Sequence, residues 1–125
     1  MSESFNAQFI DKIDYLLVKC EENATVEQKE KTLDTVVDFI KNQAVENVLF
    51  DIRDSLNGMT DEDHLVCGNL ISERSDTLSS SKVAFLTHHH EPVLFLSEAY
   101  AQGYSNFIEL DSIPEASLWF SGQIR

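Results

Sequence analysis

Residues 47–52 have the sequence NVLFDI, a short apolar run in which apolar and polar residues do not strictly alternate. Such a run is typical of a strand that is covered on both faces of a sheet. Segments with the periodicity of amphipathic helices lie before and after it. The sequence therefore predicts a central strand in an α/β fold, and the other elements can be placed outward from this strand.

Helices are predicted on both sides of this strand. The segment Thr25–Gln28 fits a capping box, in which a hydroxyl residue is followed three positions later by Gln. After the turn signal Asn57-Gly58, Thr60 is expected to open a second helix, with acidic residues in its first turn. In the first helix, apolar residues continue at helical spacing, at Leu33, Val36, Val37, Ile40 and Ala44. The second helix is expected to bury Leu65, Val66, Leu70 and Ile71.

Two further strands are predicted, a buried one over 82–86 and the last one over 107–110. Residues 79–81 are expected to form the loop before the first of these strands. The segment Ser112–Glu115 is a further capping signature, and it predicts a last helix that includes Ala116, Trp119 and Phe120. In such a helix the two aromatic residues are expected in the core.

The chain is expected to open with a hairpin of two strands, over 5–10 and 15–20, because the polar residues 11–14 have the length of a hairpin connection. With a third helix predicted from Pro92 to near Gly103, the element order is ββαβαβαβα. Parallel pairing with one antiparallel hairpin gives a mixed sheet of about five strands. A single domain over residues 1–125 is expected.

Charge and hydropathy exclude some classes of partner. The 125 residues carry a formal net charge of −13, which repels phosphate backbones, so nucleic acid is not an expected partner. The apolar runs are too short to span a bilayer and no secretory leader is recognised, which favours a cytoplasmic protein. Cys20 and Cys67 lie in no metal-binding motif, so both are expected to be reduced, mostly buried thiols.

Three stretches resemble the SpoIIAA-like family of the STAS superfamily: VENVLFDIRDS at 45–55, SKVAFLTHHHEPVLFLSEAY at 81–100 and FIELDSIPEASLWF at 107–120. The resemblance covers nearly the whole chain and rests on element order and burial pattern. It implies a compact mixed sheet with helices on one side, and a function in binding or regulation. The chain departs from the family's antagonist subset, which carries a phosphorylatable serine before the helix that follows the third strand.

The stretch that corresponds to this phosphorylation motif is DSLNGMTDEDH, at 54–64. Thr60 is the best positional match, but the three acidic residues after it would repel a phosphate. Ser55 is a weaker candidate. The phosphorylation switch of the family is therefore not expected here.

Three consecutive histidines, His88, His89 and His90, follow the strand over 82–86, at the edge of an open sheet where ligands usually bind. In an extended segment, only His88 and His90 can share a face. A metal site would need them together with Asp51, Asp54 or His64. The alternative, and the preferred interpretation, is a solvated loop whose imidazoles titrate near neutral pH.

The predicted third helix contains VLFLSEAY, with apolar residues on almost all sides of its first two turns. One interpretation is that the helix packs between the sheet and another element. The other is an exposed apolar surface for a protein partner, a homodimer contact or a lipophilic ligand. The expected ligand or partner surface combines this helix with the strand ends: Leu94, Phe95, Tyr100, Asp54, Ser55, His88 and His90.

No catalytic motif is recognised: the sequence has no GxSxG, no Gly-rich phosphate loop and no HExxH. The leading hypothesis is a non-catalytic binding or regulatory module that contacts a protein or a small lipophilic molecule. It needs no cofactor. The alternative is a metal-dependent or hydrolytic enzyme centred on the histidine run, with His88, His90, Asp51 and Asp54 at its site.

Overall fold

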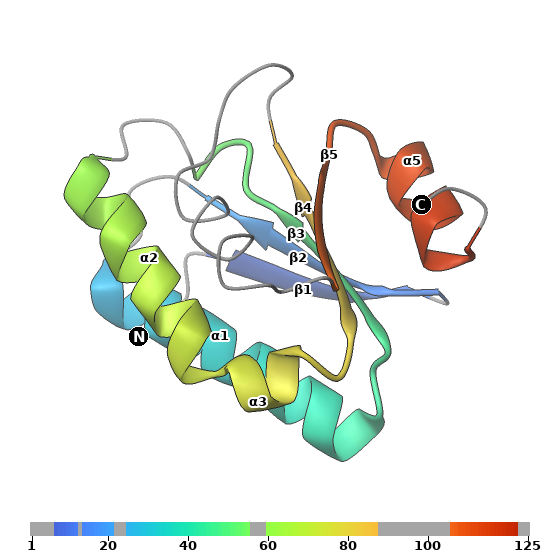
Figure 1. Cartoon of the computed structure of the whole chain (residues 1–125), viewed down its shortest axis with the longest axis horizontal. Helices are drawn as coiled ribbons and strands as arrows, with labels where there is room; N and C mark the ends of the chain where they lie inside the picture. Colours follow the sequence, from blue (N-terminus) through green and yellow to red (C-terminus); the bar gives the residue numbers. More distant parts are fainter. Residues whose placement is uncertain (1–6, 13, 22–24, 56–59, 88–105, 123–125) are drawn as a thin grey trace.

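Five short strands form one mixed sheet in the computed structural model of the chain, which describes residues 7–12, 14–21, 25–55, 60–87 and 106–122. The strands lie side by side in chain order (Figure 1). β1 and β2 are antiparallel, and each later strand is parallel to the one before it. The predicted mixed α/β sheet is thus confirmed. The strands are β1 (Ala7–Asp11), β2 (Leu16–Cys20), β3 (Asn47–Asp51), β4 (Lys82–Leu86) and β5 (Phe107–Leu110).

The predicted helix starts are confirmed for three helices. Thr25 accepts a hydrogen bond from the Gln28 amide at 3.1 Å, and the Gln28 side chain accepts one from the Thr25 amide at 2.9 Å. Thr60 and Asp63 form the same reciprocal pair, and Ser112 caps the last helix. The helices of the described residues are α1 (Val26–Gln43), α2 (Asp61–Glu73), the short α3 (Ser75–Leu78) and α5 (Ile113–Phe120).

Helices cover both faces of the sheet. On one face, Val48 and Phe50 of β3 join a core with α1, α2 and α3. On the other face, Leu49 of β3 joins Trp119 and Phe120 of α5. Figure 1 shows α5 across the sheet from the other helices. Alternate residues of a strand point to opposite faces, so the apolar run of β3 needs cover on both sides.

The expectation that all helices lie on one side of the sheet is therefore wrong. Ala84 and Leu86 of β4 are fully buried on the face that α5 covers. Without a helix on that face, these side chains would be exposed to water. The predicted third helix, from Pro92 to near Gly103, lies outside the described residues.

Two details differ from the prediction, one within α2 and one directly after it. Leu65 is 60% exposed, so it does not belong to the buried stripe of α2, whereas Leu70 and Ile71 are buried. Cys67 lies three and four residues before these two, and it packs against the core in place of Leu65. The chain also forms α3 before the predicted loop over 79–81, where no helix was expected.

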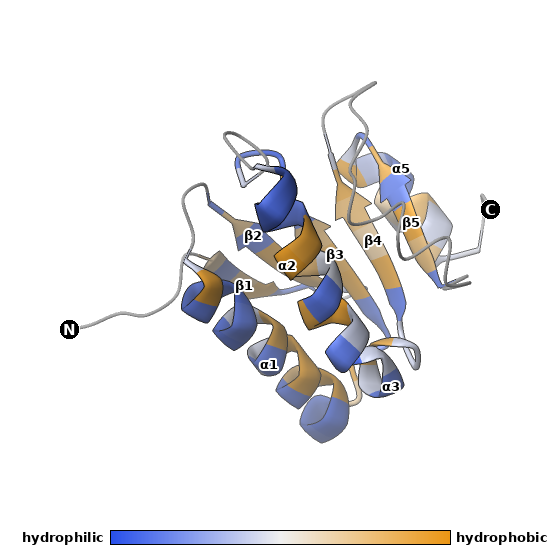
Figure 2. Cartoon of the chain, turned by 60° about the vertical axis from the view of Figure 1, so that its left-hand side comes forward, coloured by the Kyte–Doolittle hydropathy of each residue, from blue (hydrophilic) through white to orange (hydrophobic). Residues whose placement is uncertain are grey.

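Polar residues face outward on α1, and its apolar stripe faces the sheet (Figure 2). Within the described part of the chain, no helix combines the length and the apolar character that a membrane crossing requires.

Candidate functional site: an apolar pocket between two helices and the sheet

A pocket of about 80 Å³ lies between α1, α2 and the sheet. It is near the carboxyl ends of β2 and β3, because Cys20 ends β2 and Ser55 follows β3. Ligands of open α/β sheets usually bind at this edge. The described lining is mostly apolar and consists of Cys20, Glu21, Lys29, Thr32, Leu33, Phe50, Ile52, Ser55, Cys67, Leu70, Ile71 and Phe85.

Two stacked aromatic rings contribute to the lining from the sheet. Phe50 of β3 and Phe85 of β4 are direct partners in the parallel register. Their ring centroids are 5.2 Å apart and their planes differ by 11°. Phe107 of β5 continues the row, with its ring centroid 5.6 Å from that of Phe85. The sheet therefore presents a rigid aromatic surface to the pocket.

Two polar groups in the pocket wall, the hydroxyl of Thr32 and the thiol of Cys20, have partners within the chain. The Thr32 hydroxyl donates to the Gln28 carbonyl at 2.8 Å, one turn earlier in α1. The Cys20 thiol donates to the Val18 carbonyl, with a sulfur–oxygen distance of 3.9 Å. These donors are thus already used, and the interior favours an apolar guest.

Both cysteines line this pocket, although they are far apart in the sequence. Burial, the negative charge of Asp51 and the neighbouring Cys67 together raise the pKa of Cys20 to about 12. Burial also raises the pKa of Cys67, with a further rise from Asp63 and a partial opposing effect of Lys29. Both thiols are free, and with their raised pKa values both are protonated at neutral pH.

Charged and hydroxyl side chains complete the described lining at Glu21, Lys29 and Ser55. Among the described residues, the Lys29 ammonium forms no ion pair. Its charge nevertheless acts on Asp63 and on Cys67 of α2. Since Glu21 and Lys29 have opposite signs, the described part of the lining has no net charge.

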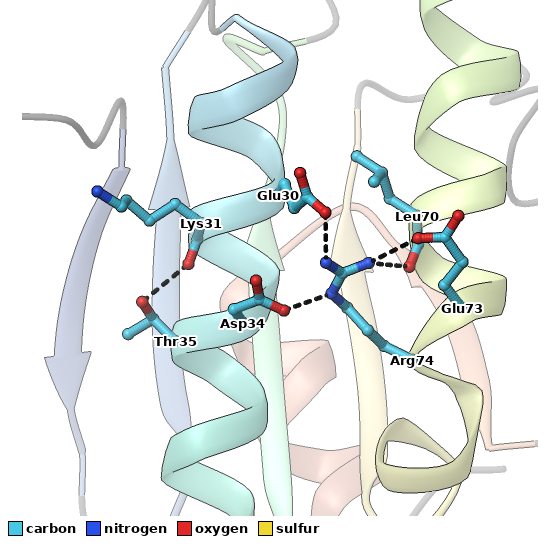
Figure 3. A network of polar contacts seen from close by, with 7 residues as sticks. All are labelled: Glu30, Lys31, Asp34, Thr35, Leu70, Glu73 and Arg74. Carbon is cyan, nitrogen blue, oxygen red and sulfur yellow. Dashed lines mark hydrogen bonds and ion pairs between the residues drawn. The ribbon is translucent and has the colours of Figure 1, made fainter.

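Arg74, the residue that ends α2, ties the two helical walls together (Figure 3). Its guanidinium contacts Asp34 at 2.7 Å and Glu30 at 3.0 Å, both on α1. It also donates to the carbonyl of Leu70 at 2.9 Å. Because Leu70 lines the pocket, this network holds one wall of the pocket against the other.

Of the residues expected at the strand ends, Ser55 lines the pocket and Asp54 is exposed. Asp51 is 6% exposed, and its two carboxylate oxygens accept bonds of 3.0 and 2.9 Å from the Arg53 guanidinium. Burial raises the pKa of Asp51, but the hydrogen bonds and charge of Arg53 outweigh it, so the net pKa is lowered. A metal ion at Asp51 would have to displace this guanidinium.

Other expected site residues, His88, His90, Leu94, Phe95 and Tyr100, lie outside the described residues. Among the residues that are described, no group of three His, Cys, Asp or Glu side chains could hold a metal ion. His64, a further candidate ligand, is on α2, and burial lowers its pKa.

The sequence did not reveal the pocket residues Cys20, Lys29 and Cys67 as one group. A partial signal exists for Cys67, whose spacing to Leu70 and Ile71 puts it on the buried stripe of α2. No comparable signal links Cys20 to α2, because their proximity depends on how the helices pack on the sheet.

Comparison with models of protein families gives no match for this chain, and comparison with curated proteins gives no significant match. The resemblance to the SpoIIAA-like family therefore stays a prediction from the sequence.

Proposed function

We propose that the protein is a non-catalytic binding module that holds a small lipophilic molecule in the pocket between α1, α2 and the sheet. The observation that supports this function is the mostly apolar lining at the carboxyl ends of two parallel strands. The occupied hydrogen-bond donors of Thr32 and Cys20 favour the same class of guest.

The chemistry of the described lining favours binding over catalysis. A thiol with a raised pKa is a weak nucleophile at neutral pH, because the thiolate is the reactive form. Asp51, which the hydrolytic alternative would use, is paired with Arg53. A regulatory contact with another protein through Leu94 and Phe95 stays a prediction from the sequence.

Native mass spectrometry and organic extraction of the untagged protein test the proposal. We expect the wild type to retain one small apolar molecule per chain, or to take up one added in excess. The variant Cys67→Phe should lose this capacity, because the larger side chain fills the pocket. Cys67→Leu is a milder second variant, in case the first one does not fold.

Leu118→Phe is the matched control, since Leu118 is 40% exposed on α5, across the sheet from the pocket. It adds similar apolar area without filling the pocket. Binding that is equal in the wild type, the control and both Cys67 variants would contradict the proposed site. Failure of the wild type to bind any small apolar molecule would contradict the proposed function.

A further inference from the structure

We infer that the pocket selects neutral molecules built on a single aromatic ring. This inference rests on the proposed function and names the chemical class of its ligand. It depends on three properties of the described lining: the stacked phenylalanine rings, the absence of a net charge in this lining, and the small volume.

The aromatic surface favours an aromatic guest. Phe50 and Phe85 stack with an interplanar angle of 11°, and both rings line the pocket. A third ring can add to such a pair in an offset or an edge-to-face arrangement, which a saturated ring of the same size cannot do. Cys20 and Cys67 line the same space, and free cysteines pack as small apolar groups.

The electrostatics of the lining favour a neutral guest. A charged group that enters the pocket loses hydration, and only a matched partner can compensate for that loss. Both thiols stay protonated at neutral pH, and the Thr32 donor is already used. Glu21 and Lys29 carry opposite charges, so the described lining has no net charge, and the net charge of −13 of the chain further disfavours anions.

The volume limits the guest to a small molecule. An apolar cavity of about 150 Å³ in another protein binds benzene. The pocket of this chain measures about 80 Å³, roughly half of that volume, so a single ring would have to stay partly exposed at the open side and a fused ring system would be too large. A hydroxyl or carbonyl substituent on that ring could then bond to the Lys29 ammonium or to Ser55.

The test is a titration of the ¹⁵N-labelled protein with toluene and with methylcyclohexane, followed by NMR. Both molecules have a six-membered ring with one methyl group, so a difference in affinity reports on the aromatic character of the ring. We expect saturable shifts at the pocket residues, with toluene bound at least about tenfold more tightly than methylcyclohexane. Benzoate and benzylammonium, which carry the same ring with a charge, should bind at least about tenfold more weakly than toluene.

The results distinguish this inference from the proposed function. Equal binding of toluene and methylcyclohexane would overturn the aromatic selectivity and leave a lipophilic pocket intact. Charged rings that bind as tightly as toluene would overturn the requirement for neutrality. If neither hydrocarbon shifts the pocket resonances, the proposed function fails along with the inference.

Phe50→Leu tests the origin of the selectivity, because it removes a ring from the lining and keeps an apolar side chain. The ratio of the two affinities should fall toward one in this variant. Phe107→Leu is the matched control, since Phe107 is also a buried ring of the sheet but is not among the residues that line the pocket. The ratio is measured within each variant, so a general loss of stability does not imitate the effect. An unchanged ratio in Phe50→Leu would contradict the stacking argument.

Discussion

Arg74, at the end of α2, donates a hydrogen bond of 2.7 Å from Nε to a carboxylate oxygen of Asp34 on α1. The side chain of Arg74 is only 12% exposed, and it also contacts Glu30 and the carbonyl of Leu70. One side chain thus joins the two helices that line the pocket. Charge-assisted bonds from a largely buried guanidinium contribute more to stability than exposed ion pairs do.

Replacement of Arg74 by Ala should lower the free energy of unfolding by about 1 to 3 kcal/mol, because the bonds to α1 and the packing of the Arg stem are lost together. Arg74→Lys should recover only part of this loss, since an ammonium group cannot bond to both carboxylates with the geometry of a guanidinium. Urea denaturation measures both changes.

The control for this prediction is Glu73→Gln, because Glu73 contacts Arg74 at 3.4 Å from an exposed position. Its effect should stay within about 0.5 kcal/mol. An Arg74→Ala variant as stable as the wild type would show that this network does not hold α2 against α1.

His64 should make the stability of the protein depend on pH. Burial lowers the pKa of His64, and Lys29 adds to this effect, whereas Asp61 and Asp63 oppose it. Because the folded pKa lies below the ordinary value of 6.5, the unfolded chain binds the proton more readily. The contribution of neutral His64 to stability is therefore complete above pH 6.5 and is lost as the pH falls through the folded pKa.

The check is the free energy of unfolding of the wild type and of His64→Gln between pH 7.5 and pH 5. The wild type should lose stability relative to the variant as the pH falls. The difference between the two proteins removes the effect of the other histidines, which are common to both. A difference that does not change with pH, or that changes in the opposite direction, would contradict the lowered pKa.

Alkylation of the cysteines should be slow in the folded protein. With its pKa at about 12, Cys20 has a very small thiolate fraction at pH 8. Higher intrinsic nucleophilicity offsets part of this effect, so iodoacetamide should react with Cys20 roughly 100-fold more slowly than with an ordinary thiol. Peptide mass spectrometry over time measures the rate at each cysteine.

The same reaction in urea is the control, because the unfolded chain has ordinary thiols. A bound guest should slow the reaction of both cysteines further, since both line the pocket. If folded and unfolded protein react at equal rates, the cysteines are not buried as described.

Local sequence patterns were sufficient to predict most of the sheet and the helix starts. The strands over 82–86 and 107–110 and the caps at Thr25 and Thr60 depend on short-range chemistry, and the structure has them where they were predicted. Which face each helix covers depends on long-range packing, so the position of α5 could not be derived in the same way. The exposure of Leu65 has a similar cause: helical spacing alone does not show which side of α2 meets the sheet.

The pocket was harder to predict from the sequence than the positions of the helices. Ser55 was expected near a site because it follows β3, and it does line the pocket. Cys20 and Cys67 come from a strand end and a helix that are 47 positions apart, and no motif links them. Their common position arises only when α1 and α2 pack side by side on one face of the sheet.

Because helices cover both faces of the sheet, replacement of Trp119 should strongly lower the free energy of unfolding. Its side chain is buried on the face that α5 covers, where it packs with Leu49 and Leu86 in one cluster. Trp119→Ala should lower the free energy of unfolding by about 3 to 5 kcal/mol, as expected for a large side chain removed from a core. Urea or thermal denaturation measures the loss.

Leu118→Ala is the neighbouring control, since Leu118 is 40% exposed on the same helix and Trp119 is only 8% exposed. Its effect should stay below about 1 kcal/mol. Similar small effects for both variants would show that α5 does not cover the sheet as described.

A crystal structure determined under xenon pressure tests the central claim most directly. Xenon is an apolar probe that enters small apolar cavities and is located by its scattering. We expect a xenon atom between Leu33, Phe50 and Leu70 in the wild type, and none at that position in Cys67→Phe. A wild-type crystal in which other side chains fill this space, or in which xenon binds elsewhere only, would contradict the binding pocket.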